Sequence, residues 1–142
     1  GEPGKVHKGS VRSMIKRMYK QNSPDMGVYQ IRNTANGRIY VGSTTNLEGI
    51  RNSRLFQLRM GKVVFSRELQ KDLDRFGAES FEFSVLEVLE NAETGTKSDR
   101  SLASLYVRWL EKLQPFGERG YNSAKAYQRD VNRLINQGDE PG

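Results

Sequence analysis

The 142-residue chain contains no cysteine and a single histidine, His7. Without cysteine it can form neither a disulfide nor a thiolate metal site, and one histidine in a polar segment cannot build a histidine-based zinc site. Any metal must therefore be held by oxygen atoms, the ligands preferred by magnesium and manganese. The sequence also lacks an apolar run long enough to span a membrane and has no signal peptide, so the cytoplasm is the default compartment and no membrane partner is expected.

Positive charge exceeds negative charge in this sequence. Lys and Arg number 23 against 17 Asp and Glu, a net charge of +6 with a pI near 9.7. Such a surplus favours a polyanionic partner, although basic proteins without one also show it. The length suits one domain with a real core. We expect a basic N-terminal arm or helix over 1–25, a domain over 26–123, and a C-terminal helix with a polar tail over 124–142. The oligomeric state does not follow from the sequence.

Apolar spacing and turn residues predict the order of elements. Asn36-Gly37 can supply the positive-φ residues of a tight turn between two strands. Ser66 is expected to cap one helix, and Gly61 and Gly77 are expected to end two of them. Strands are predicted over 26–32, 38–43 and 80–88, and a loop over 90–97. Helices are predicted over 11–20, 67–76, 98–113 and 124–136, and one more runs from Thr45 or Asn46 to Met60. This order predicts an α+β fold, a small three-stranded antiparallel sheet flanked by helices.

Two tyrosines stand in mirrored tripeptides on the first two predicted strands. Gly27-Val28-Tyr29 and Tyr40-Val41-Gly42 flank the Asn36-Gly37 turn. Tyrosine is common in strands, and two tyrosines across a hairpin are usually packing residues. The alternative is that both phenols face a functional site.

The ordered set of motifs over about 27–122 resembles the GIY-YIG nuclease family. It comprises G-V-Y-Q-I, the N-G turn, I-Y-V-G-S, the following helix, F-E-F-S-V-L-E, W-L-E-K-L and a closing G-Y-N. The resemblance implies phosphodiester hydrolysis in DNA or RNA with Mg²⁺ or Mn²⁺. It also implies that Tyr29 or Tyr40 helps to activate water and that Asn122 supports the site.

The family's phosphate-holding arginine is matched by Ile50, not by an arginine. Arg51 is the next residue, and one residue on a helix is about 100° of rotation, so Arg51 serves only if the helix slips near Glu48-Gly49. Arg54 matches the position of a second polar group in the family and could supply the missing charge. The alternative is that Arg51 and Arg54 are solvated helix residues.

The family's metal-binding glutamate is matched by Tyr106, three residues before Trp109. A phenol, with a pKa of about 10, is a poor magnesium ligand at neutral pH. Glu111 lies roughly 140° round the helix and is expected to face solvent. Asp99, two turns back, is the only carboxylate of this helix that could substitute, so the metal ligand is unknown.

A group of cations follows the tyrosine hairpin. Phosphate binding by such a group would be largely independent of base sequence and weakened by salt. The candidates are Arg51, Arg54, Arg59, Lys62, Arg67 and Lys71. Three functions remain open: a divergent metal-dependent endonuclease, a catalytically silent nucleic-acid-binding module on the same fold, and a protein-interaction domain.

Overall fold

The structure is a computed structural model, and it describes residues 24–89 and 96–138. The predicted helix over 11–20 and most of the predicted loop over 90–97 lie outside these residues. The strands are β1 (Gly27–Asn33), β2 (Ile39–Thr44) and β3 (Phe81–Val88). The helices are α2 (Leu47–Met60), α3 (Arg67–Phe76), α4 (Thr96–Leu113) and α5 (Ala124–Gly138), with short 3-10 turns η2 (Ala78–Ser80) and η3 (Gly117–Arg119).

The sheet has the order β2-β1-β3, and both pairings are antiparallel. This confirms the predicted α+β fold with three strands. The predicted turn needs a correction, because Gly37 has a φ of 79° while Asn36 does not enter the left-handed region. The chain instead closes a wider loop, in which Asn33 donates to the carbonyl of Arg38 and accepts from the amide of Gly37.

The helix boundaries follow the capping residues. The Asn46 side chain accepts from Gly49 N at the start of α2, and the Ser66 side chain accepts from Leu69 N at the start of α3. Gly61 ends α2 in the left-handed conformation, and Gly77 ends α3. These caps confirm the predicted ends of both helices. Helix α4 begins two residues before the predicted 98.

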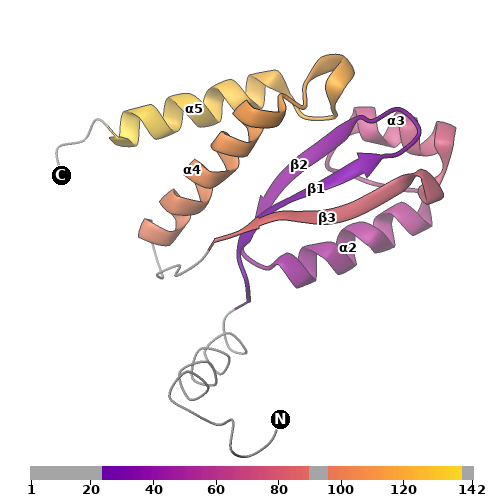
Figure 1. Cartoon of the computed structure of the whole chain (residues 1–142), viewed down its shortest axis with the longest axis horizontal. Helices are drawn as coiled ribbons and strands as arrows, with labels where there is room; N and C mark the ends of the chain where they lie inside the picture. Colours follow the sequence, from indigo (N-terminus) through magenta and orange to yellow (C-terminus); the bar gives the residue numbers. More distant parts are fainter. Residues whose placement is uncertain (1–23, 90–95, 139–142) are drawn as a thin grey trace, which may run out of the picture.

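Helices cover both faces of the sheet (Figure 1). Helices α2 and α3 lie on one face and α4 and α5 on the other, and each face has its own apolar core. Side chains alternate between the two faces of a strand, so Tyr29 and Ile31 of β1 enter the core beneath α2 and α3, while Val28 enters the core beneath α4. Helix α5 packs on α4. No helix in the described ranges is long and apolar enough to cross a bilayer.

Candidate functional site

The two motif tyrosines meet in the core between the sheet and α2. Tyr29 is only 1% exposed, and its ring centroid lies 6.3 Å from that of Tyr40. Tyr40 in turn lies 4.7 Å from the ring of Phe65, in the segment between α2 and α3. We call Tyr29, Tyr40, Phe65 and Arg54 the tyrosine cluster.

Arg54 brings a positive charge to this cluster from α2. Its Nε donates to the hydroxyl of Tyr29 at 3.3 Å, and its Cζ lies 4.2 Å from the ring centroid of Phe65. The second contact is a cation–π interaction, which orients the planar guanidinium. No hydrogen bond or ion pair between described residues uses the two terminal nitrogens. They are therefore available to an anion.

Glycine is required in both tripeptides because neighbouring groups approach the backbone closely. A Cβ at Gly42 would stand 2.5 Å from Cζ and from the hydroxyl of Tyr29. A Cβ at Gly27 would stand 2.2 Å from the carbonyl oxygen of Glu87 and 3.0 Å from Leu47. The Tyr29 ring thus occupies the space that a side chain on β2 would need.

Asn122 and Tyr106 both bind the backbone of Val41 in β2. Asn122 accepts from Val41 N and donates to Val41 O, each at 2.8 Å, and the Tyr106 hydroxyl donates to the same carbonyl at 3.2 Å. Asn122 Nδ2 also lies 3.5 Å from the Tyr106 hydroxyl. Both ends of the Asn122 amide are therefore committed to holding the segment after α4 against β2.

Burial raises the pKa of two phenols of the site, those of Tyr40 and Tyr106. Desolvation raises the pKa of Tyr40 well above its usual value, and the phenols of Tyr29 and Tyr106 add to the rise. Desolvation, with smaller contributions from Asp130 and Tyr29, raises the pKa of Tyr106 to about 12. Without a bound cation, both phenols are therefore neutral near pH 7.

Arg51 lies outside the tyrosine cluster. Helix α2 runs without the slip that would bring it there, so Ile50 packs on the core and Arg51 is exposed on another face. Glu111 is exposed, as predicted. Asp99 belongs to α4, but its side chain is not among those described.

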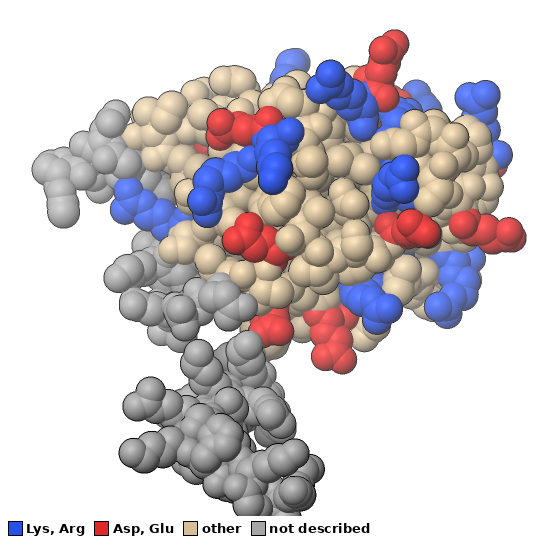
Figure 2. All heavy atoms as spheres, viewed as in Figure 1, with Lys and Arg blue, Asp and Glu red and all other residues tan. Residues whose placement is uncertain are grey.

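The other residues predicted to contact nucleic acid are exposed, but acidic side chains lie among them. Arg59, Lys62, Arg67 and Lys71 all lie at the surface, and Lys71 pairs with Glu68 at 3.5 Å. Figure 2 shows Lys and Arg spread over one face of the molecule with Asp and Glu among them. Charge on this face therefore does not by itself outline a binding surface.

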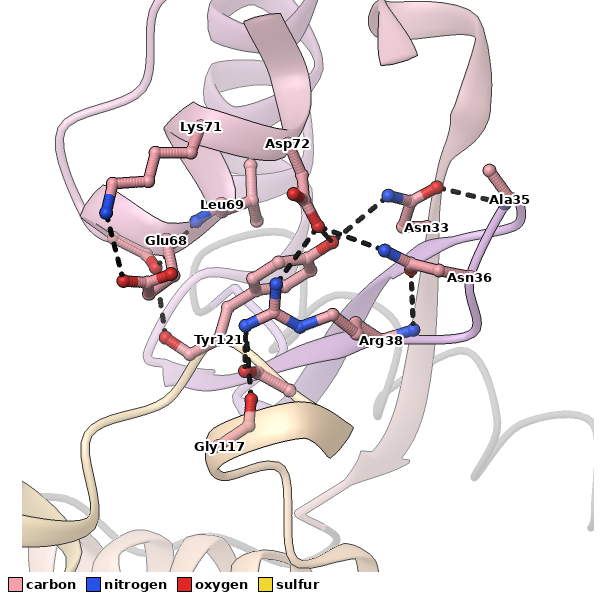
Figure 3. A network of polar contacts seen from close by, with 12 residues as sticks. Asn33, Ala35, Asn36, Arg38, Glu68, Leu69, Lys71, Asp72, Gly117 and Tyr121 are labelled. Carbon is pink, nitrogen blue, oxygen red and sulfur yellow. Dashed lines mark hydrogen bonds and ion pairs between the residues drawn. The ribbon is translucent and has the colours of Figure 1, made fainter. Parts of the chain in front are cut away.

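A buried polar network, which the sequence patterns did not indicate, holds the chain on either side of the hairpin loop (Figure 3). Asp72 Oδ2 accepts from the Tyr121 hydroxyl at 2.6 Å, from Asn36 at 3.1 Å and from Arg38 at 3.2 Å. Asn33 donates to the same Tyr121 hydroxyl. Desolvation alone would raise the pKa of Asp72, but the hydrogen bonds from Tyr121 and Asn36 and the charge of Arg38 outweigh it and lower the pKa.

Arg38 extends this network to the turn after α4. Its Nη2 donates to the carbonyls of Gly117 and Gly120, and its guanidinium lies 4.4 Å from the centroid of the Tyr121 ring. Tyr121 directly precedes Asn122, so the network fixes the segment that carries Asn122. Pairings across such long sequence separations leave no periodic signal, which is why sequence patterns could not find them.

Comparison with known proteins agrees with the fold described above. The family described as the GIY-YIG catalytic domain matches residues 25–114. The chain belongs to the GIY-YIG family. A solved structure of the catalytic domain of the homing endonuclease I-TevI is 31% identical, with a TM-score of 0.54, covering 70% of this chain and 98% of that one. A mutant of the catalytic domain of the intron endonuclease I-TevI is 30% identical, with a TM-score of 0.55, covering 69% and 92%. No curated protein matched.

The residues of this GIY-YIG domain do not fit a divalent cation at the tyrosine cluster. Mg²⁺ and Mn²⁺ prefer carboxylate, carbonyl and water oxygens. The cluster offers instead two phenols and an arginine, and the groups beside it are the phenol of Tyr106 and the committed amide of Asn122. Across the side chains that the structure describes, no group of three Asp, Glu, His or Cys could hold a metal ion.

Proposed function

We propose that this GIY-YIG domain binds nucleic acid through the phosphodiester backbone at the tyrosine cluster, without metal-dependent hydrolysis there. The observation that carries the proposal is the position of Arg54. Its Nε bonds to Tyr29 and its plane rests on Phe65, which leaves the terminal nitrogens to receive an anion. A planar guanidinium that is already oriented suits a phosphate, which it can bind through two parallel hydrogen bonds.

Family membership supports nucleic acid as the partner. Both similar solved structures are endonuclease catalytic domains at 30% and 31% identity. Hydrolysis needs a deprotonated water and charge neutralisation at the phosphoryl oxygens. Arg54 can supply part of the second requirement, whereas the raised pKa values of Tyr40 and Tyr106 make their phenols poorer bases and poorer metal ligands than a carboxylate.

Binding at several salt concentrations tests this proposal. A fluorescein-labelled 20-base-pair DNA would be titrated with wild type, Arg54→Ala and Arg108→Ala, the last an exposed arginine on α4. Losing one phosphate contact should weaken binding about tenfold and make the slope of log affinity against log salt shallower by about one. The expected result is this loss in Arg54→Ala alone. Equal binding by all three proteins would contradict the proposal.

A divergent endonuclease remains the second candidate, favoured by one observation. Tyr29, Tyr40 and Arg54 converge in one place, and Asn122 lies at the adjoining edge of β2. These are four of the five residues that the sequence assigns to catalysis. On this reading a carboxylate outside the described side chains, such as Asp99, would have to hold Mg²⁺ or Mn²⁺.

A further inference from the structure

The side of helix α2 that faces away from the sheet carries two large apolar side chains. Phe56 is 57% exposed and Met60 is 65% exposed, and they are neighbours on the helix surface because they are four residues apart. Two small residues continue the line toward the start of the helix, which gives the outer stripe of α2: Gly49, Ser53, Phe56 and Met60. None of the four is charged. Spacings of four, three and four residues are typical of a face that packs against another helix.

The described chain begins beside the start of α2. Leu47 N donates to Asp25 O at 2.9 Å, and Pro24 is the first residue described. Phe56 lies nine residues beyond Leu47, which is about 14 Å along the helix axis. The five residue steps from 20 to 25 span up to about 17 Å when extended. A segment that ends near residue 20 can therefore reach the outer stripe.

The sequence that precedes Pro24 has a pattern that complements this stripe. Val11, Met14, Ile15 and Met18 recur at the spacing of one helical face. The cations of the predicted helix over 11–20 fall on its other face: Arg12, Lys16, Arg17 and Lys20. A helix of this length is marginal in water and depends on packing of its apolar face for stability. It therefore needs an apolar surface within reach.

We propose that residues 11–20 form a helix that packs on the outer stripe of α2 in the same molecule. Because its C-terminal end is tied to the start of α2, this helix runs antiparallel to α2. It covers Phe56 and Met60 with its apolar face and leaves its cations in solvent. The contact needs no nucleic acid, so this inference and the proposed function can each fail without the other.

Disulfide trapping tests this contact cleanly, because the chain has no cysteine of its own. Met14→Cys is combined with Met60→Cys in the full chain. The matched control combines Met14→Cys with Ile135→Cys, since Ile135 of α5 is also apolar and is 54% exposed. After mild oxidation, an intramolecular disulfide is detected by faster migration in a non-reducing gel that reduction reverses.

Two further substitutions, each added to the Met14→Cys/Met60→Cys chain, separate docking from chance encounter. Ile15→Asp places a carboxylate on the apolar face of the segment, and Ser13→Asp places the same group on its polar face. Thermal unfolding of each variant checks that the domain is folded.

We expect the Met14→Cys/Met60→Cys chain to form its disulfide about tenfold faster than the control chain. Ile15→Asp should slow this reaction about tenfold, and Ser13→Asp should leave it nearly unchanged. Equal rates for the two cysteine pairs, or no effect of Ile15→Asp, would overturn the proposal. Disulfide-linked dimers in place of the intramolecular product would also overturn it, and would identify a second copy of the chain as the occupant of the stripe.

Discussion

Tyr29 joins three elements of the fold through one side chain. Its ring stacks on Phe83 of β3 and lies beneath Gly42 of β2, and its hydroxyl accepts from Arg54 of α2. A residue that is 1% exposed and packed on every side behaves as a core residue. Tyr29 can therefore be both a packing residue and part of the site, because its ring packs in the core while its hydroxyl binds Arg54.

At Gly42, any side chain must displace the ring of Tyr29. We predict that Gly42→Ala lowers the free energy of unfolding by about 1–3 kcal/mol, the usual cost of overpacking a core. Urea unfolding followed by circular dichroism measures the change. Ser43→Ala, on the next residue of β2, should change stability by less than about 0.5 kcal/mol. Equal stability of Gly42→Ala and wild type would contradict the close approach of Tyr29.

Asn122 is expected to stabilise the fold, whatever its part in chemistry. Asn122→Ala removes both hydrogen bonds to Val41 and leaves those buried backbone groups without the amide partner. We predict a loss of about 2 kcal/mol in unfolding free energy, within the range for an unsatisfied buried group. Asn136→Ala, at an exposed position of α5, is the matched control and should be neutral. A neutral Asn122→Ala would refute this role.

At the scale of elements, the segment between α4 and α5 is held against β2 by polar contacts from both sides. Tyr121 N donates to Ile39 O, Asn122 binds Val41, and the Tyr121 hydroxyl reaches Asp72 of α3. Asp72 itself joins three parts of the chain: its own helix α3, the hairpin loop through Asn36 and Arg38, and this segment through Tyr121. Protonating that carboxylate should loosen all of them together.

The lowered pKa of Asp72 predicts the direction of a pH effect. A carboxyl whose pKa is lower in the folded state stabilises the fold at pH values above its unfolded pKa, about 3.9, and loses that stabilisation as pH falls through the folded value. We predict that Asp72→Asn is less stable than wild type at pH 7 and that this difference narrows below about pH 4.

Urea unfolding between pH 3 and pH 7 measures this difference directly. Glu68→Gln removes an exposed carboxyl on the same helix. Its free energy of unfolding should change with pH in the same way as that of wild type over the whole range. A stability difference between Asp72→Asn and wild type that is independent of pH would show that the charge of Asp72 does not stabilise the fold.

At the scale of the whole molecule, local signals in the sequence predicted the elements well. Asn46, Ser66, Gly61 and Gly77 act within a few residues of themselves, so the ends of α2 and α3 could be predicted. The conformation of the hairpin loop could not, because the long-range bond from Asn36 to Asp72 is part of what fixes it.

The candidate site was predictable in its composition but not in its arrangement. The pairing of Tyr29 with Tyr40 and the approach of Arg54 agree with the order of motifs, whereas the exclusion of Arg51 depends on where α2 begins. The roles of Phe65 and Phe83 could not be predicted, because their contacts with Arg54 and Tyr29 depend on how distant parts of the chain pack together.

Incubation of supercoiled plasmid with the protein at low salt, in Mg²⁺, in Mn²⁺ and in EDTA, tests most directly whether the domain binds DNA without cleaving it. Half of each sample is analysed for nicking and half in a retardation assay. We expect salt-sensitive retardation in all three conditions, weaker for Arg54→Ala, and no nicking above the EDTA background. Metal-dependent nicking that Tyr29→Phe and Arg54→Ala abolish would contradict it, and would establish the divergent endonuclease in its place.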